Sequence, residues 1–460
     1  MFKFEFDLGD LTEEARPTPQ NAQSKETQPS LNANKEKLAD IGGEGPCVVI
    51  PLDKLIDQLP PFITYSNLKI NSRLSVYKRE LYDAKYQTIV NLAAEEEEED
   101  EAADKSQEKG SKDKGVSKQQ TLESLQSTSD LIPGIYEGGF KTWECSIDLA
   151  THLDPVIDKL KTIFTRRDDQ IRCAVEQDGN SLEQGTFRIL EIGCGTAVPT
   201  ASLCFQLFVY LLNRDRSTTL HSSSISNNQL KAPILEIILQ DFNSDVLKLL
   251  TFPNILLAFY RATLVAGKDK ENTSLESRDN TREQTDEETN GENTIEEDLE
   301  ITDELKTEFE IFLRSHGIQL TFIYGPWSTF KLPPIAPDRT SPFLVTDCER
   351  GSVKGCEAII SSETLYSVES LPSLINVILS SKITYCHRPQ DEEASKDDST
   401  ILIASKSIYF GVGGGTHSFI NSIEKTHNGV VSLIDLHHSD QSPLASNGVS
   451  RVLMDIKFLA

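Results

Sequence analysis

The stretch that most constrains the fold runs over residues 187–200, FRILEIGCGTAVPT. Six mainly apolar residues lead into a Gly-Cys-Gly turn, and Pro199 stands where a helix would begin. Apolar side chains then recur at helical spacing through residues 201–212. The pattern predicts a strand, a glycine turn and a helix, a unit that presents free backbone N–H groups to a ligand. Proline suits the first turn because its missing N–H would have no intrahelical partner.

The residues of this turn narrow the class of ligand. Gly193 and Gly195 permit a tight turn and a close approach of the backbone to a cofactor. Glu191 precedes them on the predicted strand, where its charge would repel the pyrophosphate of a dinucleotide. A carboxylate there favours a cofactor that carries an ammonium group and no phosphate, such as S-adenosylmethionine. Ala197 replaces the third glycine of the usual pattern, and a plain turn is the alternative interpretation of the pattern alone.

Composition separates the foldable part of the chain from polar tracts. The 460 residues include 72 acidic and 45 basic side chains, which give a net charge of −27. This balance argues against affinity for nucleic-acid phosphates and favours a basic protein partner, or simply solubility. We predict a disordered segment over 1–45, a small N-terminal extension over 46–92, an acidic disordered linker over 93–128 and one domain over 129–460. Polar inserts at about 213–230, 267–300 and 387–399 are also predicted to be disordered.

Cysteine and histidine usage bounds the chemistry. The eight cysteines form no Cys-x-x-Cys pair, and the eight histidines show no metal-ligand spacing with acids or thiols, so we predict free thiols and no metal. The chain has no run of about 18 apolar residues, and MFKFEFDLGD is unlike a targeting peptide. We therefore expect a monomer in the cytoplasm and nucleus, with no membrane contact.

A helix is predicted over residues 146–160, and apolar runs alternate with helical patterns from residue 187 to the end. The runs lie at 187–192, 234–239, 320–324, 358–360, 401–404, 430–436 and 452–458. The first five are short and continuous, which is typical of parallel strands buried on both faces. We predict an α/β fold with a doubly wound, seven-stranded, Rossmann-like sheet. Ligands of such sheets bind at the carboxyl ends of the strands.

Polar residues follow several of these strands. Asp241 offers two acceptor oxygens for the two hydroxyls of a ribose, although capping of the following helix is the alternative. Trp327 is placed either to stack on an adenine ring or to pack in the core. Glu363 is either a solvated carboxylate or an acceptor for a substrate N–H. The glycine-rich residues 411–415 form either a flexible hairpin tip or a wall of the substrate site.

Several motifs together resemble one enzyme family. They are LIPGIYEGG at 131–139, KTWEC at 141–145, LEIGCG at 190–195, QDFN at 240–243, SETLY at 362–366 and ASKSIYFGVGGG at 404–415. With them the chain resembles the protein-histidine N-methyltransferases that modify a large-subunit ribosomal protein, a branch of the seven-β-strand methyltransferases. The resemblance covers about residues 130–460 apart from the inserts, and residues 47–75 weakly. The chain departs from the family pattern at Ala197, a family glycine, and at Pro326, where relatives often carry an acid that contacts adenine.

The resemblance implies S-adenosyl-L-methionine as methyl donor and S-adenosyl-L-homocysteine as product. It assigns the cofactor contacts to Lys141, Thr142, Trp143, Glu144, Cys145, Gly193, Gly195, Gln240, Asp241, Phe242, Gly325, Trp327 and Ser361, beside Glu191. It places Tyr366, Gly413 and Gly414 at the substrate. As a hypothesis, a side-chain acceptor fixes the second ring nitrogen of the target imidazole; Glu363 is the first candidate and Asn243 the second.

Other functions remain open at this point. A lysine methyltransferase of the same fold would also suit an acidic pocket, and a ribosomal-protein chaperone would use the cofactor only for stability. A small-molecule methyltransferase is disfavoured because its substrate would not require 130 residues ahead of the domain. The expected partner is a basic ribosomal protein, without direct binding of nucleic acid. The acidic inserts either attract that partner or are solvated filler.

Overall fold

The computed structural model describes residues 45–91, 138–176, 186–218, 234–274, 295–334, 355–383, 399–409, 413–436 and 450–459. The strands are β1 (Val48–Ile50), β2 (Phe62–Lys69), β3 (Ser75–Arg79), β4 (Phe187–Ile192), β5 (Leu235–Asp241), β6 (Glu296–Glu300), β7 (Ile318–Tyr324), β8 (Ala358–Ser362), β9 (Thr400–Lys406), β10 (Gly429–Ile434) and β11 (Arg451–Phe458). The helices are α2 (Leu52–Asp57), α5 (Glu144–Ala150), α6 (Asp154–Glu176), α7 (Val198–Thr218), α8 (Ser244–Val246), η2 (Leu247–Thr251), α9 (Phe252–Ser274), α10 (Asp303–His316), η3 (Trp327–Thr329), α11 (Leu371–Ser381) and α12 (Thr416–Thr426).

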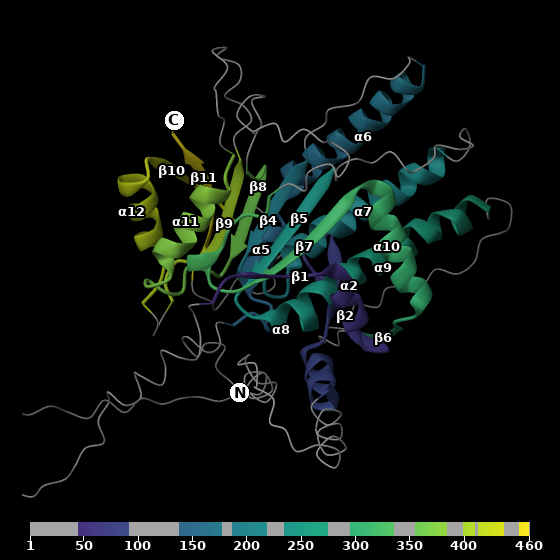
Figure 1. Ribbon diagram of the computed structural model, residues 1–460, viewed down its shortest axis with the longest axis horizontal. Helices are drawn as coiled ribbons and strands as arrows, with labels where there is room; N and C mark the ends of the chain where they lie inside the picture. The colour runs from purple at the N-terminus through teal and green to yellow at the C-terminus, as the bar shows by residue number, and fades with distance from the viewer. Residues whose placement is uncertain are drawn as a thin grey trace, which may run out of the picture. The chain divides into compact units, whose positions relative to one another are not determined.

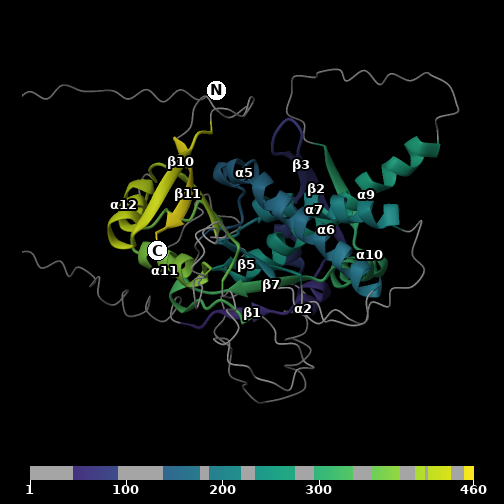
Figure 2. The ribbon, with the colours of Figure 1, turned by 90° about the horizontal axis from the view of Figure 1, so that it is seen from above.

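Eight strands form the main sheet in the order β1-β7-β5-β4-β8-β9-β11-β10. The five central strands, from β7 to β9, are parallel, whereas β1, β11 and β10 pair antiparallel at the two sides. Helices cover both faces of this sheet (Figures 1 and 2). The strand order reverses direction at β4, whose neighbours are β5 and β8. The predicted doubly wound α/β fold is therefore confirmed, with β1 as an additional strand.

Both faces of the central strands are buried, which explains their continuous apolar sequences. On β4, Ile189 packs toward the core under α5, α6, α7, α9 and α10, whereas Leu190 and Ile192 pack toward α11 and α12. On β5, Ile237 packs in the same core as Ile189, and Ile238 packs in the same core as Leu190 and Ile192. Because successive side chains of a strand point to opposite faces, a strand covered on both sides needs no polar alternation.

A second sheet of three strands, in the order β3-β2-β6, involves a segment that the sequence analysis assigned to disorder. Residues 296–300 form β6, so the predicted insert over 267–300 is wrong at this end, and α9 also extends to Ser274. The acidic strand is held through its side chains: Tyr65 donates a hydrogen bond to Glu297 and Thr64 donates one to Asp298, both at 2.6 Å. Contacts with β2 therefore make a strand of an acidic segment whose sequence alone predicts disorder.

Three further boundaries differ from the sequence prediction. The insert placed at 213–230 begins too early, because α7 continues to Thr218. The helix expected over 146–160 is two helices, α5 and α6, that meet at residues 151–153. The insert placed at 387–399 ends too late, because the Ser399 hydroxyl donates to the carbonyl of Cys356. The remainder of these inserts, the segment 1–44 and the linker 93–128 lie outside the described residues.

The N-terminal extension is part of the same structural unit as the large domain. Strand β1 pairs with β7, and β2 with β3 packs against α9. Arg79 is buried, and its guanidinium contacts Asp83 at 2.6 Å and the carbonyl of Leu249 at 2.9 Å. Separating a buried charge from its partners would lower the free energy of unfolding considerably. Residues 46–91 are therefore an integral part of the domain.

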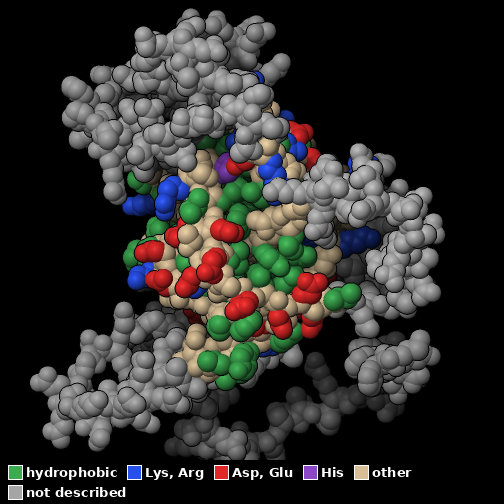
Figure 3. Space-filling model, turned by 90° about the vertical axis from the view of Figure 1, so that its right-hand side faces the viewer, with side chains coloured by type: hydrophobic (Ala, Val, Ile, Leu, Met, Phe, Trp, Pro, Cys, Tyr) green, Lys and Arg blue, Asp and Glu red, His purple; other side chains and the backbone are tan. Residues whose placement is uncertain are grey.

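Among the described residues, one continuous helical stretch, Ser244–Gly267, is long and apolar enough to cross a membrane, but 72% of its apolar 18-residue window is buried inside the protein, as in a core helix. Within the described ranges, no cluster of three or more His, Cys, Asp or Glu side chains could hold a metal ion. Figure 3 shows the side of the molecule that carries α9, α10 and β6, where acidic side chains are interspersed with hydrophobic ones.

Candidate active site

The glycine turn after β4 is shaped by close neighbours. Gly193 and Gly195 have φ values of 61° and 51°. A Cβ on Gly193 would lie 2.6 Å from Thr364 Cγ2, and one on Gly195 would lie 3.3 Å from the carbonyl oxygen of Gly139. Both positions therefore require glycine, for dihedral angle and for space. Ala197 has a φ of 51°, a conformation that a glycine would adopt without strain.

Glu191 lies beneath the turn and is fully buried. Its Oε2 accepts hydrogen bonds from the N–H and the hydroxyl of Thr200 at the start of α7, whereas its Oε1 has no hydrogen-bond partner among the described residues. Burial raises the pKa of Glu191 to about 8, against the Thr200 hydrogen bonds, which lower it. This carboxylate does not line the cavity described below.

The buried Glu191 predicts a specific pH dependence of stability. Its ordinary pKa is 4.5 and its folded pKa is about 8, so the folded state binds the proton more tightly than the unfolded state. The stabilisation is complete below pH 4.5 and is lost as the pH rises through 8. We expect the free energy of unfolding of the ligand-free protein to fall by a few kcal/mol over this window relative to Glu191→Gln, measured by urea denaturation. Glu304→Gln, at an exposed position, should keep the wild-type slope.

Asp241 ends β5 and organises the two neighbouring loops. Its Oδ2 accepts the N–H of Gly195 at 2.9 Å, and its Oδ1 accepts the N–H of Asn243 at 3.0 Å. Burial raises the pKa of Asp241 to about 6, although these hydrogen bonds lower it. Each oxygen keeps a further lone pair, and the residue lines the cavity. The carboxylate can therefore hold the turn and still accept two hydroxyls.

Gln240 positions Trp327 from behind the cavity. Its Oε1 accepts the indole N–H of Trp327 at 2.8 Å and the N–H of Gly193 at 3.3 Å, and its Nε2 donates to the carbonyl of Gly325 at 2.9 Å. Gln240 is itself fully buried. It thus fixes the glycine turn and the tryptophan relative to each other, and leaves the tryptophan ring facing the cavity.

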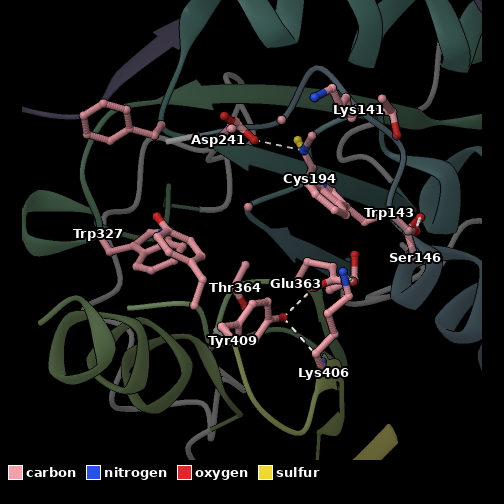
Figure 4. Close-up of a pocket in the computed structure, with 18 residues that line it drawn as sticks. Lys141, Trp143, Ser146, Cys194, Asp241, Trp327, Glu363, Thr364, Lys406 and Tyr409 are labelled. Atoms are coloured by element: carbon pink, nitrogen blue, oxygen red, sulfur yellow. Dashed lines mark hydrogen bonds and ion pairs between the residues drawn. The ribbon is translucent and has the colours of Figure 1, made fainter. Parts of the chain in front are cut away.

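Glu363 follows β8 and meets residues of β9 on the opposite side of the cavity from Asp241 (Figure 4). It is a non-glycine residue with a φ of 58°, an unfavourable conformation that is often retained at functional sites. The hydroxyl of Tyr409 donates to its Oε2 at 2.6 Å. Its Oε1 lies 3.7 Å from Lys406 Nζ and has no hydrogen-bond partner in the described part of the chain.

Cys145 and Tyr409 are neutral donors beside Glu363, whereas Lys406 is a cation and Asp148 an acid in the same surroundings. Burial, and then the charge of Glu363, raise the pKa of the Cys145 thiol and of the Tyr409 hydroxyl well above their usual ranges. Both therefore stay protonated at physiological pH. A protonated thiol is a poor nucleophile, so Cys145 is unsuited to covalent catalysis.

Several of these residues line one cavity that is open to solvent. Six parts of the chain line it: the segment before α5 (residues 138–143, the strap), the glycine turn, the end of β5, η3, the loop after β8 and the end of β9. The lining residues are Gly138, Gly139, Lys141, Trp143, Ser146, Gly193, Cys194, Gly195, Thr196, Asp241, Phe242, Trp327, Ser362, Glu363, Thr364, Tyr366, Lys406 and Tyr409. The cavity lies at the carboxyl ends of the strands, as predicted for this architecture.

Several known proteins with similar sequences are named histidine protein methyltransferase 1 or a homologue of it. Histidine protein methyltransferase 1 of Schizosaccharomyces pombe is 26% identical over 407 residues, which span 88% of this chain and 86% of the relative. The Saccharomyces cerevisiae protein of that name is 28% identical over 347 residues, 75% of this chain and 68% of the relative. The chain is similar in sequence to the histidine protein methyltransferases over most of its length. A Bos taurus homologue is 24% identical over 73% of this chain and 59% of its own length.

Comparisons with family models and solved structures add little to this relationship. No family model matches the sequence. The CurJ carbon methyltransferase has a TM-score of 0.24 at 10% identity, covering 69% of this chain and 59% of its own, and a methyltransferase from Thermoplasma acidophilum has 0.22 at 8%, covering 59% and 68%. TM-scores this low do not establish a common fold. The fold follows instead from the order and direction of the strands.

The structure brings about half of the predicted site residues into the cavity. Those that line it are Lys141, Trp143, Gly193, Gly195, Asp241, Phe242, Trp327, Glu363 and Tyr366. Thr142, Cys145, Glu191, Gln240, Gly325 and Ser361 lie behind this lining, whereas Glu144, whose side chain is 41% exposed, is not part of it. Ser361 is typical of them: its hydroxyl contacts the carbonyl of Ile192 at 2.8 Å and Thr364 Oγ1 at 2.7 Å. These residues support the cavity wall.

Three predicted residues take other positions. The side-chain amide of Asn243 donates to the carbonyl of Gly138 at 3.2 Å, so it anchors the strap and does not reach the cavity. Gly413 pairs with Ser367, and a Cβ on Gly414 would lie 2.1 Å from the carbonyl oxygen of Tyr366. These two glycines support the Tyr366 loop from behind, without lining the cavity.

Sequence reasoning missed Lys406 and Tyr409 as cavity residues, along with Ser146, Cys194, Thr196, Ser362 and Thr364. Lys406 and Tyr409 lie within the ASKSIYFGVGGG motif, in which only the glycines are predicted to shape the site. The rule that placed polar residues at strand ends applies equally to Lys406, the last residue of β9. Applied to every strand, it would have found this lysine.

Proposed function

We propose that the chain is an S-adenosylmethionine-dependent protein methyltransferase that modifies a histidine imidazole nitrogen. The observation that carries this proposal is the position of Glu363, which lines the cavity. One of its carboxylate oxygens accepts a hydrogen bond from the Tyr409 hydroxyl, and the other has no hydrogen-bond partner in the described chain. A carboxylate so placed can accept the N–H of an imidazole. The names of the relatives support the same reaction.

The cavity fits S-adenosylmethionine at its other side. Asp241 offers acceptors for the ribose hydroxyls, and Trp327 and Phe242 offer aromatic surfaces for adenine. The turn at Gly193 and Gly195 has no side chain to obstruct the cofactor, and no phosphate-binding set is needed. When bound, the cofactor supplies an electrophilic methyl group on a sulfonium sulfur.

The chain's own residues orient the nucleophile and exclude water. Neutral imidazole is nucleophilic near pH 7, so the enzyme need not generate a stronger base. Glu363 accepts a hydrogen bond from the ring nitrogen that is not methylated, fixes the tautomer, and takes the proton that this nitrogen loses once the ring is positively charged. Tyr409 holds the carboxylate in place, and Trp143 and Trp327 bound the cavity on two sides (Figure 4). Orientation and desolvation supply most of the rate enhancement.

The substrate proposed from the resemblance is a basic protein of the large ribosomal subunit. The net charge of −27 and the acidic side chains visible in Figure 3 favour encounter with a basic protein. A cofactor-binding chaperone of the same protein is the alternative function, and it would bind the substrate without modifying it.

The test uses purified protein, labelled S-adenosylmethionine and an extract from cells that lack the enzyme. Labelled proteins are hydrolysed to amino acids. We expect the label in methylhistidine from one basic ribosomal protein. Label in methyllysine would assign the reaction to lysine instead. No label, together with cofactor binding in a calorimeter, would favour the chaperone.

A further inference from the structure

Lys406 occupies a site that has the features of an ammonium-binding site. Its Nζ lies 3.5 Å from Glu144 Oε2, 3.7 Å from Glu363 Oε1 and 4.4 Å from the centre of the Trp143 ring. Both carboxylate oxygens are buried and have no hydrogen-bond partner within the described ranges. Two carboxylates and an aromatic face are the groups that recognise a cationic amine in proteins.

This site is part of the cavity. Lys406, Glu363 and Trp143 all line it, and the lysine side chain is 18% exposed. The ammonium is thus supplied by the chain itself, at the place where the ammonium of a substrate lysine would otherwise bind. A second ammonium would be repelled by the first, which already offsets one of the two carboxylate charges. A neutral imidazole meets no such penalty, because it needs only an acceptor for its N–H.

We propose that Lys406 is a specificity-determining residue that excludes lysine from the substrate site and admits histidine. The inference rests on the proposed function, since it concerns which side chain the methyl group reaches. It also gives a physical reason why an acidic, aromatic cavity need not be a lysine methyltransferase site. The resident lysine fills the cation-binding features, so the selection is electrostatic and does not depend on the size of the side chain.

The experiment compares two probes of side-chain chemistry, imidazole and n-butylammonium, with the full-length protein saturated with S-adenosylhomocysteine at pH 7.5. Dissociation constants are measured by ligand-observed NMR. For the wild type we expect n-butylammonium to bind at least about tenfold more weakly than imidazole. In Lys406→Met the ratio of the two constants should fall by at least about tenfold. Lys406→Gln carries the same expectation should the methionine variant fail to fold.

Two variants serve as controls. Lys406→Arg keeps the cation and should keep the wild-type ratio. Lys382→Met removes a lysine that lies 5.5 Å from the centre of the Phe458 ring, outside the cavity, and should also keep that ratio. An unchanged ratio in the folded neutral variants, or a wild type that binds n-butylammonium as tightly as imidazole, would overturn the proposal.

Product analysis separates this proposal from the proposed function. A wild type that forms methyllysine in the extract would overturn both. A wild type that forms methylhistidine, with a Lys406→Met variant whose ratio is unchanged, would overturn the role of Lys406 alone. A wild type that forms neither product, with the expected ratios, would overturn the proposed reaction and support exclusion of cations by Lys406.

Discussion

Glu363→Gln is expected to lower kcat by about 100-fold or more while the affinity for S-adenosylhomocysteine changes less than about threefold. The amide can still accept the hydrogen bond of Tyr409, and its shape is nearly that of the carboxylate, so the fold should be kept. It cannot take the proton that the imidazole loses, and it no longer offsets the positive charge on the ring. Initial rates of methylhistidine formation, with calorimetry for the product cofactor, provide the measurement.

Two further variants make this result specific. Tyr409→Phe removes the hydrogen bond that holds Glu363 and should cost about tenfold in kcat, the effect of one lost hydrogen bond to a charged group. Glu369→Gln changes an exposed carboxyl a few residues further along the chain and should have the wild-type rate. Glu363→Gln with wild-type turnover and wild-type cofactor affinity would show that another group accepts the imidazole N–H.

The sequence predicts those parts of the fold that are determined by a few neighbouring residues, such as an apolar run or a glycine turn. The run over residues 187–192 is apolar because β4 is buried on both faces, and Gly193 and Gly195 are required by positive φ and close neighbours. Both features appear in a single window of sequence, so strand, turn and helix could be assigned together. The position of Asp241 follows from the same rule, since the carboxyl ends of parallel strands share one edge.

Features set by distant partners could not be predicted in this way. The sequence EEDLE of β6 has low strand propensity and becomes a strand because β2, more than 200 residues earlier, supplies hydroxyl donors to its carboxylates. The contact of Tyr409 with Glu363 spans 46 residues, and no spacing rule connects the two. The position of Asn243 beside Asp241 suggested a role in the cavity, but its side chain turns to the strap at Gly138.

Asp241→Asn is expected to weaken binding of S-adenosylhomocysteine by about 100-fold or more. The carboxylate accepts the N–H groups of Gly195 and Asn243 on separate oxygens. An amide has one acceptor oxygen, so its NH₂ group would face one of these N–H donors and displace that loop. The amide also loses an acceptor for the ribose. Asp245→Asn changes a half-buried acid of α8 that pairs with Lys248 of η2; it is the matched control and should bind the product cofactor as the wild type does.

The same residue predicts how binding depends on pH. Burial raises the pKa of Asp241 to about 6, so the carboxylate is ionised at pH 7.5 and protonated below 6. A proton on either oxygen removes an acceptor, and the affinity for S-adenosylhomocysteine should therefore fall as the pH is lowered from 7.5 to 5. The groups of S-adenosylhomocysteine do not titrate in this range. In Asp241→Asn this component of the pH dependence should be absent, while any contribution from Glu191 persists. Equal pH profiles for wild type and variant, measured by calorimetry, would show that Asp241 does not bind the cofactor through its charged form.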